Sequence, residues 1–296
     1  MIAIDLGSNT LRAIEIDCDT LAFGRSFERM VKTADGLKSS GKISDAAIER
    51  VIEALQAMKK ELDFDTQQVV AKTTAAMRMA TNTQEALEQI YNACGVEFEV
   101  IDAKQEAFYT QIAVSKRLET LSLPTQYVLL DVGGGSTELI ICDEISKSKS
   151  IDVGIVTMSQ SYTDQESLIK NLYHELEPFK DFLRTHEYKP KMLVSTAGTP
   201  TTMASMKQGL TVQTYDPHKI NGTTLNRDEL DFQLTRLMAM DETQRALHVG
   251  VGRDSLIVTG VEILRVLMDL LDYKQMVVVD DGMREGIAFH SCSEMS

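Results

Sequence analysis

The sequence predicts an α/β protein built from two domains. Short apolar strands alternate with helices at amphipathic spacing along most of its 296 residues. A unit of strand, glycine turn and strand occurs twice, at residues 2–17 and 127–143, which indicates an internal duplication. A chain of this length can also bury two cores. We place the N-terminal domain at residues 1–120 together with the C-terminal tail at about 282–296, and the C-terminal domain at 121–281.

The first half predicts strands and helices in alternation. The strands IAIDL and LRAIEID flank a tight GSNT turn. Residues 43–62 place apolar side chains at helical spacing, with Ser44 or Asp45 as the N-cap. A buried strand (QQVVAKTT), a helix to Ala93, a strand (VEFEVI) and a helix at 104–119 follow.

The second half repeats this order after the polar stretch LSLPTQ. The segment YVLLDVGGGSTELIICD is again strand, glycine turn and strand. A helix at 165–185, a strand at MLVSTAG and an amphipathic helix starting near Asn226 come next. The chain ends with the helix SLIVTGVEILRVLMDLL, the strand QMVVVDD and the helix REGIAFH.

Composition and charge exclude several classes of protein. Hydrophobic residues make up 43% and charged residues 25%, which is ordinary for a globular chain. The net charge of −14 disfavours nucleic acid as a partner. No apolar run approaches the roughly 20 residues that span a bilayer, and the N-terminus lacks the basic flank of a signal peptide. We therefore expect a cytoplasmic protein with no membrane or nucleic-acid partner.

The four cysteines are scattered and show no metal-ligand spacing. Cys18, Cys94, Cys142 and Cys292 form no CxxC pair. In a cytoplasmic protein, this pattern predicts reduced and mostly buried thiols.

The segment DVGGGSTE is the strongest local motif. Three consecutive glycines let backbone amides converge on a phosphate, and the following hydroxyl groups add donors. Asp131 and Glu138 at its two ends offer the hard oxygen ligands that Mg²⁺ prefers. A glycine-rich hairpin, with Asp131 capping its turn, is the alternative. The phosphate-binding residues predicted here are Gly133, Gly134, Gly135, Ser136 and Thr137.

Three further segments join strand ends to small or polar residues. Asp5–Thr10 follows the first strand and matches the glycine motif, although a structural turn is an equal alternative. Ser195–Thr202 favours a phosphate site at a helix start, or a simple Ser/Thr cap. Asp280–Gly286, taken alone, is an ordinary turn with an N-cap.

Together these motifs resemble the exopolyphosphatase/guanosine pentaphosphate phosphohydrolase (Ppx/GppA) family of the actin-like ATPase superfamily. The matching segments, in chain order, are Asp5 to Arg12, Thr74 to Arg78, Glu106-Ala107, Asp131 to Glu138, Gly198 to Thr202, and Asp280 to Gly286. The resemblance implies two actin-like (ribonuclease H-like) domains with a central cleft. It implies an Mg²⁺-dependent hydrolase that releases the terminal phosphate of polyphosphate or guanosine pentaphosphate, and a homodimer as a further expectation.

The resemblance also implies a role for each matched residue. Glu106 corresponds to the catalytic carboxylate that orients or deprotonates water, and Asp131 and Glu138 to the metal ligands, assisted by Asp5. The phosphate-binding residues that it implies or that the loops predict are Gly7, Ser8, Asn9, Arg12, Arg78, Gly198 and Thr199, besides the glycine motif.

Two departures leave alternative functions open. Gln105 stands where the family often has an acid, and Thr157 where members commonly have an arginine. They favour a catalytically weak nucleotide or alarmone sensor as one alternative. An actin-like ATPase or sugar kinase is another, because the same phosphate loops would serve it.

Overall fold

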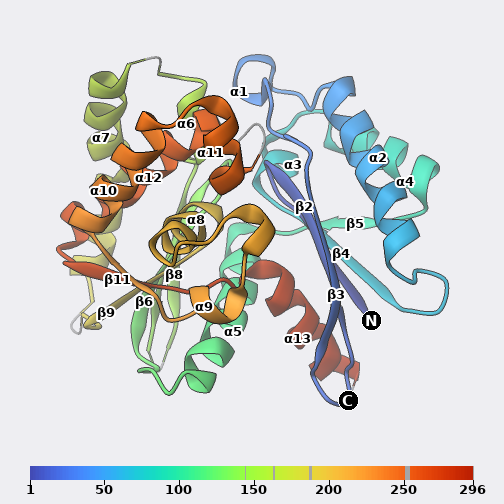
Figure 1. The fold of residues 1–296 in the computed structure, drawn as a ribbon. Coiled ribbons are helices and arrows are strands. Elements are labelled where there is room, and N and C mark those ends of the chain that lie inside the picture. Colours follow the sequence, from blue (N-terminus) through green and yellow to red (C-terminus); the bar gives the residue numbers. More distant parts are fainter. Residues whose placement is uncertain (144, 163, 187–188, 251–253, 296) are drawn as a thin grey trace. The chain divides into compact units, whose positions relative to one another are not determined.

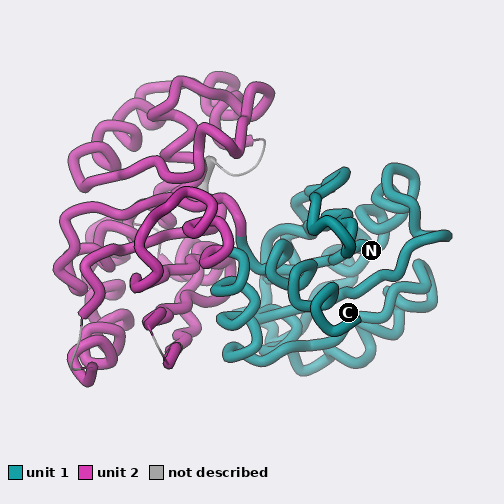
Figure 2. Tube along the Cα trace, turned by 90° about the horizontal axis from the view of Figure 1, so that it is seen from below, with its two compact units in different colours: residues 1–113, 282–296 teal, residues 114–281 magenta. Residues whose placement is uncertain are grey.

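The computed structural model describes residues 1–296 except 144, 163, 187–188, 251–253 and 296. The chain divides into two compact units, drawn in different colours in Figure 2. Unit 1 comprises Met1–Ala113 and Gly282–Ser296, and unit 2 comprises Val114–Asp281. Each unit holds one mixed β-sheet, so the predicted α/β class is confirmed.

Unit 1 has a five-stranded sheet in the order β3-β2-β1-β4-β5 (Figure 1). Its strands are β1 (Ile2–Leu6), β2 (Thr10–Ile16), β3 (Phe23–Met30), β4 (Val69–Thr73) and β5 (Phe98–Val100). Its helices are α1 (Leu37–Ser40), α2 (Asp45–Glu61), α3 (Ala75–Met79), α4 (Thr83–Cys94), most of α5 (Ala103–Thr120), and α13 (Met283–Met295). β1 pairs antiparallel with β2 and parallel with β4.

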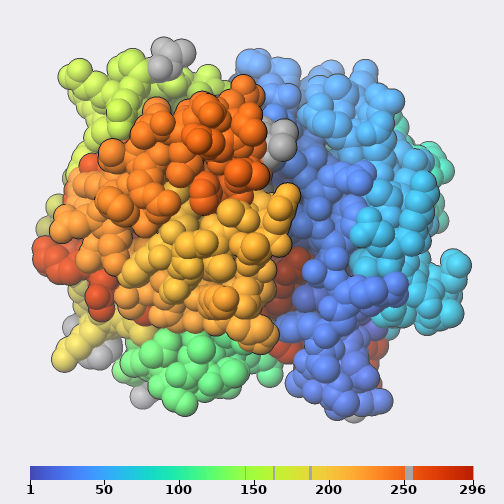
Figure 3. Space-filling model, viewed as in Figure 1, coloured from blue at the N-terminus to red at the C-terminus, as the bar shows by residue number. Residues whose placement is uncertain are grey.

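Unit 2 has a six-stranded sheet in the order β10-β11-β9-β6-β7-β8. Its strands are β6 (Tyr127–Val132), β7 (Thr137–Cys142), β8 (Lys147–Ile151), β9 (Met192–Thr196), β10 (Thr224–Asn226) and β11 (Gln275–Val278). Its helices are α6 (Ile155–Ser159), α7 (Gln165–Arg184), α8 (Gly198–Lys207), α9 (Pro217–Ile220), α10 (Arg227–Ala239), α11 (Glu242–Val249) and α12 (Asp254–Leu271), with a 3₁₀ turn at Val212–Thr214. In the space-filling view, the helices that follow β9 cover the visible face of this unit (Figure 3).

The two sheets share one topology, which confirms the duplication predicted from the repeated glycine turns. The order β3-β2-β1-β4-β5 in unit 1 corresponds to β8-β7-β6-β9-β11 in unit 2. In both units the first strand lies centrally, antiparallel to the second and parallel to the fourth. The strand that begins each unit therefore ends at an equivalent place in its own sheet.

Amphipathic helices cover these sheets as the sequence pattern predicts. Helix α2 begins where the Ser44 side chain accepts a hydrogen bond from the Ala47 amide at 3.3 Å, and its apolar stripe is buried. In unit 2, α7 and α12 pack against each other, with Leu176, Phe179 and Leu264 fully buried. None of the helices in the described ranges combines the length and apolar character needed to cross a bilayer.

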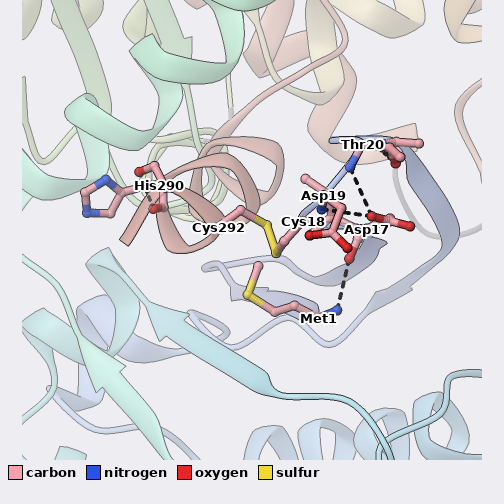
Figure 4. The surroundings of a disulfide bond; sticks show 10 residues. Met1, Asp17, Cys18, Asp19, Thr20, His290 and Cys292 are labelled. Carbon is pink, nitrogen blue, oxygen red and sulfur yellow. Dashed lines mark hydrogen bonds between the residues drawn. A yellow bond between two sulfur atoms is a disulfide. The ribbon is translucent and has the colours of Figure 1, made fainter. Parts of the chain in front are cut away.

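Cys18 and Cys292 form a disulfide, so the prediction that all four thiols are reduced is wrong for this pair (Figure 4). Helix α13 packs on β1 and β2, and this packing brings the two Cα atoms to 5.1 Å although 274 residues separate them in sequence. Cys94 and Cys142 are free and buried, as predicted. Burial raises the pKa of both thiols, that of Cys142 to about 12.

Reducing this disulfide is expected to destabilise unit 1. It closes a loop of most of the chain, and losing such a cross-link typically costs about 2–5 kcal/mol of unfolding free energy. Thermal unfolding with and without dithiothreitol measures the effect, and Cys18→Ser should match the reduced wild type. Equal melting temperatures under both conditions would show that the cross-link contributes nothing.

Candidate functional site

The glycine turn of unit 2 is held in place by hydrogen bonds that its carbonyl oxygens accept. The Gly133 amide donates to the Ser136 carbonyl at 2.9 Å and closes the turn between β6 and β7. The first amides of α6 bind it from the other side: Ile155 N–H donates to Gly133 O at 3.0 Å and Val156 N–H to Gly134 O at 2.8 Å. Because a helix start satisfies these carbonyls, the turn is held in one conformation.

Gly154 allows the turn to approach the start of α6 this closely. A Cβ atom at this position would lie 2.4 Å from the backbone of Gly134 and Gly135. Neither of those groups can move without changing the turn. No motif in the sequence marks Gly154 as part of the phosphate site.

Gly154→Ala is therefore expected to displace the glycine turn of unit 2. Overpacking of this kind costs about 1–3 kcal/mol, and we expect kcat/KM for phosphate release to fall at least about tenfold. Gly209→Ala is the matched control, because Gly209 has φ +70° with nothing near its Cβ position. Its cost should be about 1 kcal/mol of stability without loss of turnover. Unchanged kinetics in Gly154→Ala would show that the position of the turn is not critical.

Two carboxylates lie side by side at the base of this turn. Asp131 on β6 and Glu138 on β7 are directly opposite in the antiparallel register, so their side chains leave the same face of the sheet. Glu138 is 1% exposed and accepts a hydrogen bond from the Ser150 hydroxyl at 2.6 Å. Two neighbouring acids destabilise each other unless positive charge lies nearby, so this arrangement suits a bound cation.

Several predicted hydroxyl groups serve the fold instead of a phosphate. The Thr137 hydroxyl is fully buried and donates to Val153 O at 2.6 Å, so Thr137 supports the turn from behind, contrary to the prediction. Thr199, at the start of α8, is 3% exposed, and its side chain fills the space above Gly260. A phosphate at α8 would therefore meet backbone amides, such as that of Gly198, and not the Thr199 hydroxyl.

The start of α8 carries backbone strain. Ala197 has φ +80° and ψ −179°, a region populated almost only by glycine. Such strain clusters at functional sites because it aims backbone groups that ordinary geometry cannot place. The strain therefore favours the predicted phosphate-binding role of this strand end over the alternative of a simple Ser/Thr cap.

The corresponding turn of unit 1 spans Leu6 to Thr10. The Gly7 amide donates to Thr10 O at 3.0 Å. The segment after β3 braces the outer side of this turn: Val31 and Lys32 amides both donate to Asn9 O, and the Ala34 amide donates to Ser8 O. These contacts fix Gly7, Ser8 and Asn9 through their backbone.

Charged residues of alternating sign form one row across the sheet of unit 1. Neighbouring members are register partners on adjacent strands, so they lie side by side. The row, in sheet order, is Glu28, Arg12, Asp5, Lys72 and Glu99. Arg12 Nε lies 3.3 Å from Glu28 Oε2, without the alignment of a hydrogen bond, and Lys72 pairs with Glu99. Asp5 thus lies between two cations of its own sheet.

Glu106 lies in the first turn of α5 and is paired with Arg78. Arg78 Nη1 donates to Glu106 Oε2 at 3.1 Å and also to Ile101 O at 2.9 Å. The Glu106 side chain is 13% exposed. The structure thus brings together two residues that the sequence predicted separately, on α5 and α3.

The two departures from the family pattern have structural roles. Gln105 forms a capping box with Asp102: the Gln105 amide donates to Asp102 Oδ1 at 2.8 Å, and the Asp102 amide donates to Gln105 Oε1 at 3.1 Å. Thr157 is 4% exposed, and its hydroxyl accepts from the Gly154 amide at 3.0 Å. Both side chains stabilise helix starts.

Aspartate and arginine side chains also organise the last strand end and α13. Arg117 holds Asp281 through one edge of its guanidinium group: Nε donates to Oδ2 at 2.6 Å and Nη2 to Oδ1 at 3.0 Å. Glu285 accepts from the Gly282 amide at 2.9 Å and from Arg284 Nε at 2.7 Å. Taken alone, this segment was interpreted as an ordinary turn with an N-cap, and its charged side chains form ion pairs instead.

The family model described as the Ppx/GppA phosphatase family matches residues 25–294. Two curated relatives, from Vibrio vulnificus and Vibrio parahaemolyticus, are named guanosine-5'-triphosphate,3'-diphosphate pyrophosphatase. Each is 26% identical over 99% of this chain. The chain spans 59% of the length of these relatives.

Solved structures agree with this match. A Ppx/GppA family member from Aquifex aeolicus is 26% identical with a TM-score of 0.76, and the match covers 100% of this chain and 98% of that one. An exopolyphosphatase from Cytophaga hutchinsonii has the same fold, with a TM-score of 0.84 at 21% identity over 98% and 97% of the two chains. This chain belongs to the Ppx/GppA phosphatase family.

Proposed function

We propose that this chain is an Mg²⁺-dependent phosphohydrolase that releases the terminal phosphate of inorganic polyphosphate, of guanosine pentaphosphate, or of both. The observation that carries the proposal is the glycine turn of unit 2, which is fixed through its carbonyls and has two carboxylates side by side at its base. The two candidate substrates are suggested by the names of the relatives: guanosine pentaphosphate by the Vibrio proteins and polyphosphate by the Cytophaga hutchinsonii exopolyphosphatase.

The turn suits a phosphoryl group because of what its backbone presents. With the carbonyls of Gly133 and Gly134 bound by α6, the amides of the turn are the groups left to meet an anion. Phosphoryl transfer needs mainly positioning and neutralisation of charge on the equatorial oxygens. Backbone amides supply both without reorganising during the reaction.

The carboxylates fit a magnesium ion in number and kind. Mg²⁺ is commonly held by one or two carboxylates together with substrate phosphates and water. Asp131 and Glu138 provide two, and Asp5 is proposed to assist. The described ranges contain no group of three or more His, Cys, Asp or Glu side chains arranged to hold a metal ion. We propose that phosphate oxygens of the substrate and water complete the shell. When bound, the ion would neutralise charge on the phosphate oxygens.

Glu106 is proposed to orient the attacking water. Its hydrogen bond with Arg78 holds the carboxylate in one orientation, and a carboxylate oxygen can accept a hydrogen bond from water. Arg78 and Arg12 would contact phosphate oxygens, where a planar guanidinium can bind two oxygens at once.

Gln105 and Thr157 each have a structural role, which accounts for these two side chains without a sensor function. Both cap helix starts. We retain the sensor, and the ATPase or sugar kinase, as outcomes of the test.

Phosphate release by the purified chain tests the proposal. Long-chain polyphosphate, guanosine pentaphosphate and ATP are compared in parallel, with Mg²⁺ and with EDTA. We expect turnover of at least one of the first two, abolished by EDTA. Tight binding of guanosine pentaphosphate without release would favour the sensor, and a preference for ATP with a phosphate acceptor would favour the kinase.

A further inference from the structure

Arg284 is a partly buried arginine of unit 1 that the sequence analysis did not include among the phosphate-binding residues. Arg284, at the start of α13, has a side chain that is 15% exposed. Its Nε and Nη2 atoms donate to Glu285 Oε1. Nη1 has no hydrogen-bond partner in the described parts of the chain. Glu285 is itself fixed, because its other oxygen accepts from the Gly282 amide.

Helix α13 lies on the face of the sheet that carries the charged row. Met283 and Ile287 of α13 pack in one cluster with Ile14 and Ala3 of the sheet. Side chains two residues apart on a strand share a face, so Arg12, two residues before Ile14, also faces α13. Arg284 directly follows Met283 and therefore belongs to the same neighbourhood.

The charges around Arg284 agree with this placement. Burial opposes the charge of Arg284, yet its pKa is raised because Glu285 stabilises the charged form. Arg12, a like charge, lowers the pKa of Arg284, and Glu28 raises it. The two arginines each have a glutamate partner: Arg12 pairs with Glu28, and Arg284 with Glu285.

Two cations repel each other more strongly in a partly buried place than in water. The glutamates compensate that repulsion when the protein is free of ligand. A phosphate group, with up to two negative charges and several acceptor oxygens, stabilises both cations at once. Planar guanidinium groups match its oxygens better than an ammonium does.

We propose that Arg284 and Arg12 bind the same phosphate group of the substrate, and that Glu28 and Glu285 are positioning residues for these two arginines. This inference rests on the proposed function, because it concerns how the same site holds its substrate. The ligand class is a phosphate group of a phosphoanhydride chain.

Inorganic tripolyphosphate is the probe, with its affinity measured by isothermal titration calorimetry. Arg284→Met should weaken binding about 10- to 100-fold, the usual loss for a charge-assisted hydrogen bond, and Arg284→Lys should lie between it and the wild type. A double-mutant cycle with Arg12→Met tests the shared phosphate. If both arginines bind one group, the double variant loses less than the product of the two single losses.

The Glu28→Gln variant distinguishes two roles of Glu28: positioning Arg12, and acting on the bound phosphate only through its negative charge. Removing a nearby negative charge should tighten binding of an anion by electrostatics alone. If Glu28 positions Arg12, affinity should instead fall about three- to tenfold, with the larger effect on KM than on kcat. Glu15→Gln is the matched control, because Glu15 pairs with Arg25 on the same two strands, outside the charged row.

The outcomes separate this inference from the proposed function. Wild-type affinity in folded Arg284→Lys, tighter binding in Glu28→Gln, independent losses in the cycle, or no tripolyphosphate binding by the wild type would overturn the inference. If Arg284→Met does not fold, the Arg284→Lys and Glu28→Gln variants still decide it. The expected binding losses in a chain that releases no phosphate would support the inference and remove the proposed function.

Discussion

Glu106→Gln is expected to lower kcat for phosphate release by about 10²–10⁴-fold, the usual contribution of a positioned general base. Glutamine keeps the shape of the side chain and can still accept the hydrogen bond from Arg78. It removes the negative charge that orients and activates water. Initial rates of phosphate release at saturating substrate measure the effect.

Substrate affinity separates this role from a structural one. Because Glu106 acts on water, the affinity for tripolyphosphate should change by less than about threefold, or improve as a negative charge is removed. Glu85→Gln is the matched control, since Glu85 is also an acid in the first turn of a helix of unit 1. A Glu106→Gln variant that keeps most of its turnover would show that another group activates the water.

Gly286→Ala is expected to have the largest effect on stability. A Cβ atom there would lie 1.8 Å from the Tyr109 carbonyl oxygen and 2.4 Å from its carbonyl carbon. Both belong to the backbone of α5, so α13 would have to move away from α5. We expect a loss of at least about 3 kcal/mol of unfolding free energy, at the upper end of overpacking effects.

Urea unfolding measures this loss, with Gly95→Ala as the control in the same unit. Gly95 has φ +64° and open space at its Cβ position, so alanine there should cost only about 1 kcal/mol. Equal losses in the two variants would mean that the close approach of α5 and α13 tolerates an extra methyl group.

Apolar periodicity was sufficient to predict most of the fold. The strands β1 and β6 are buried at all but one position each, and their hydrophobic runs are readily recognised in the sequence. The edge strand β3 was missed because its residues are mostly polar and exposed, and β8, with no fully buried residue, for the same reason. The division between the units falls within α5, where a continuous helical pattern gives no sign of a boundary.

The candidate site was predictable where a motif carries it, and not where it depends on close approach. The glycine turn and its two acids are adjacent in sequence, so Asp131 and Glu138 could be paired directly. Gly154 lies away from the turn in sequence and is recognised only from the clash that a side chain would cause. The Cys18–Cys292 disulfide was invisible for a related reason, since 274 residues separate its ends.

The measurement that tests the central claim most directly is hydrolysis of guanosine pentaphosphate in oxygen-18-labelled water, with the products identified by mass spectrometry. Water attack on the terminal phosphorus predicts one labelled oxygen in the released orthophosphate and an unlabelled guanosine tetraphosphate. Release of pyrophosphate, label in the nucleotide product, or no hydrolysis of either guanosine pentaphosphate or polyphosphate would contradict the account.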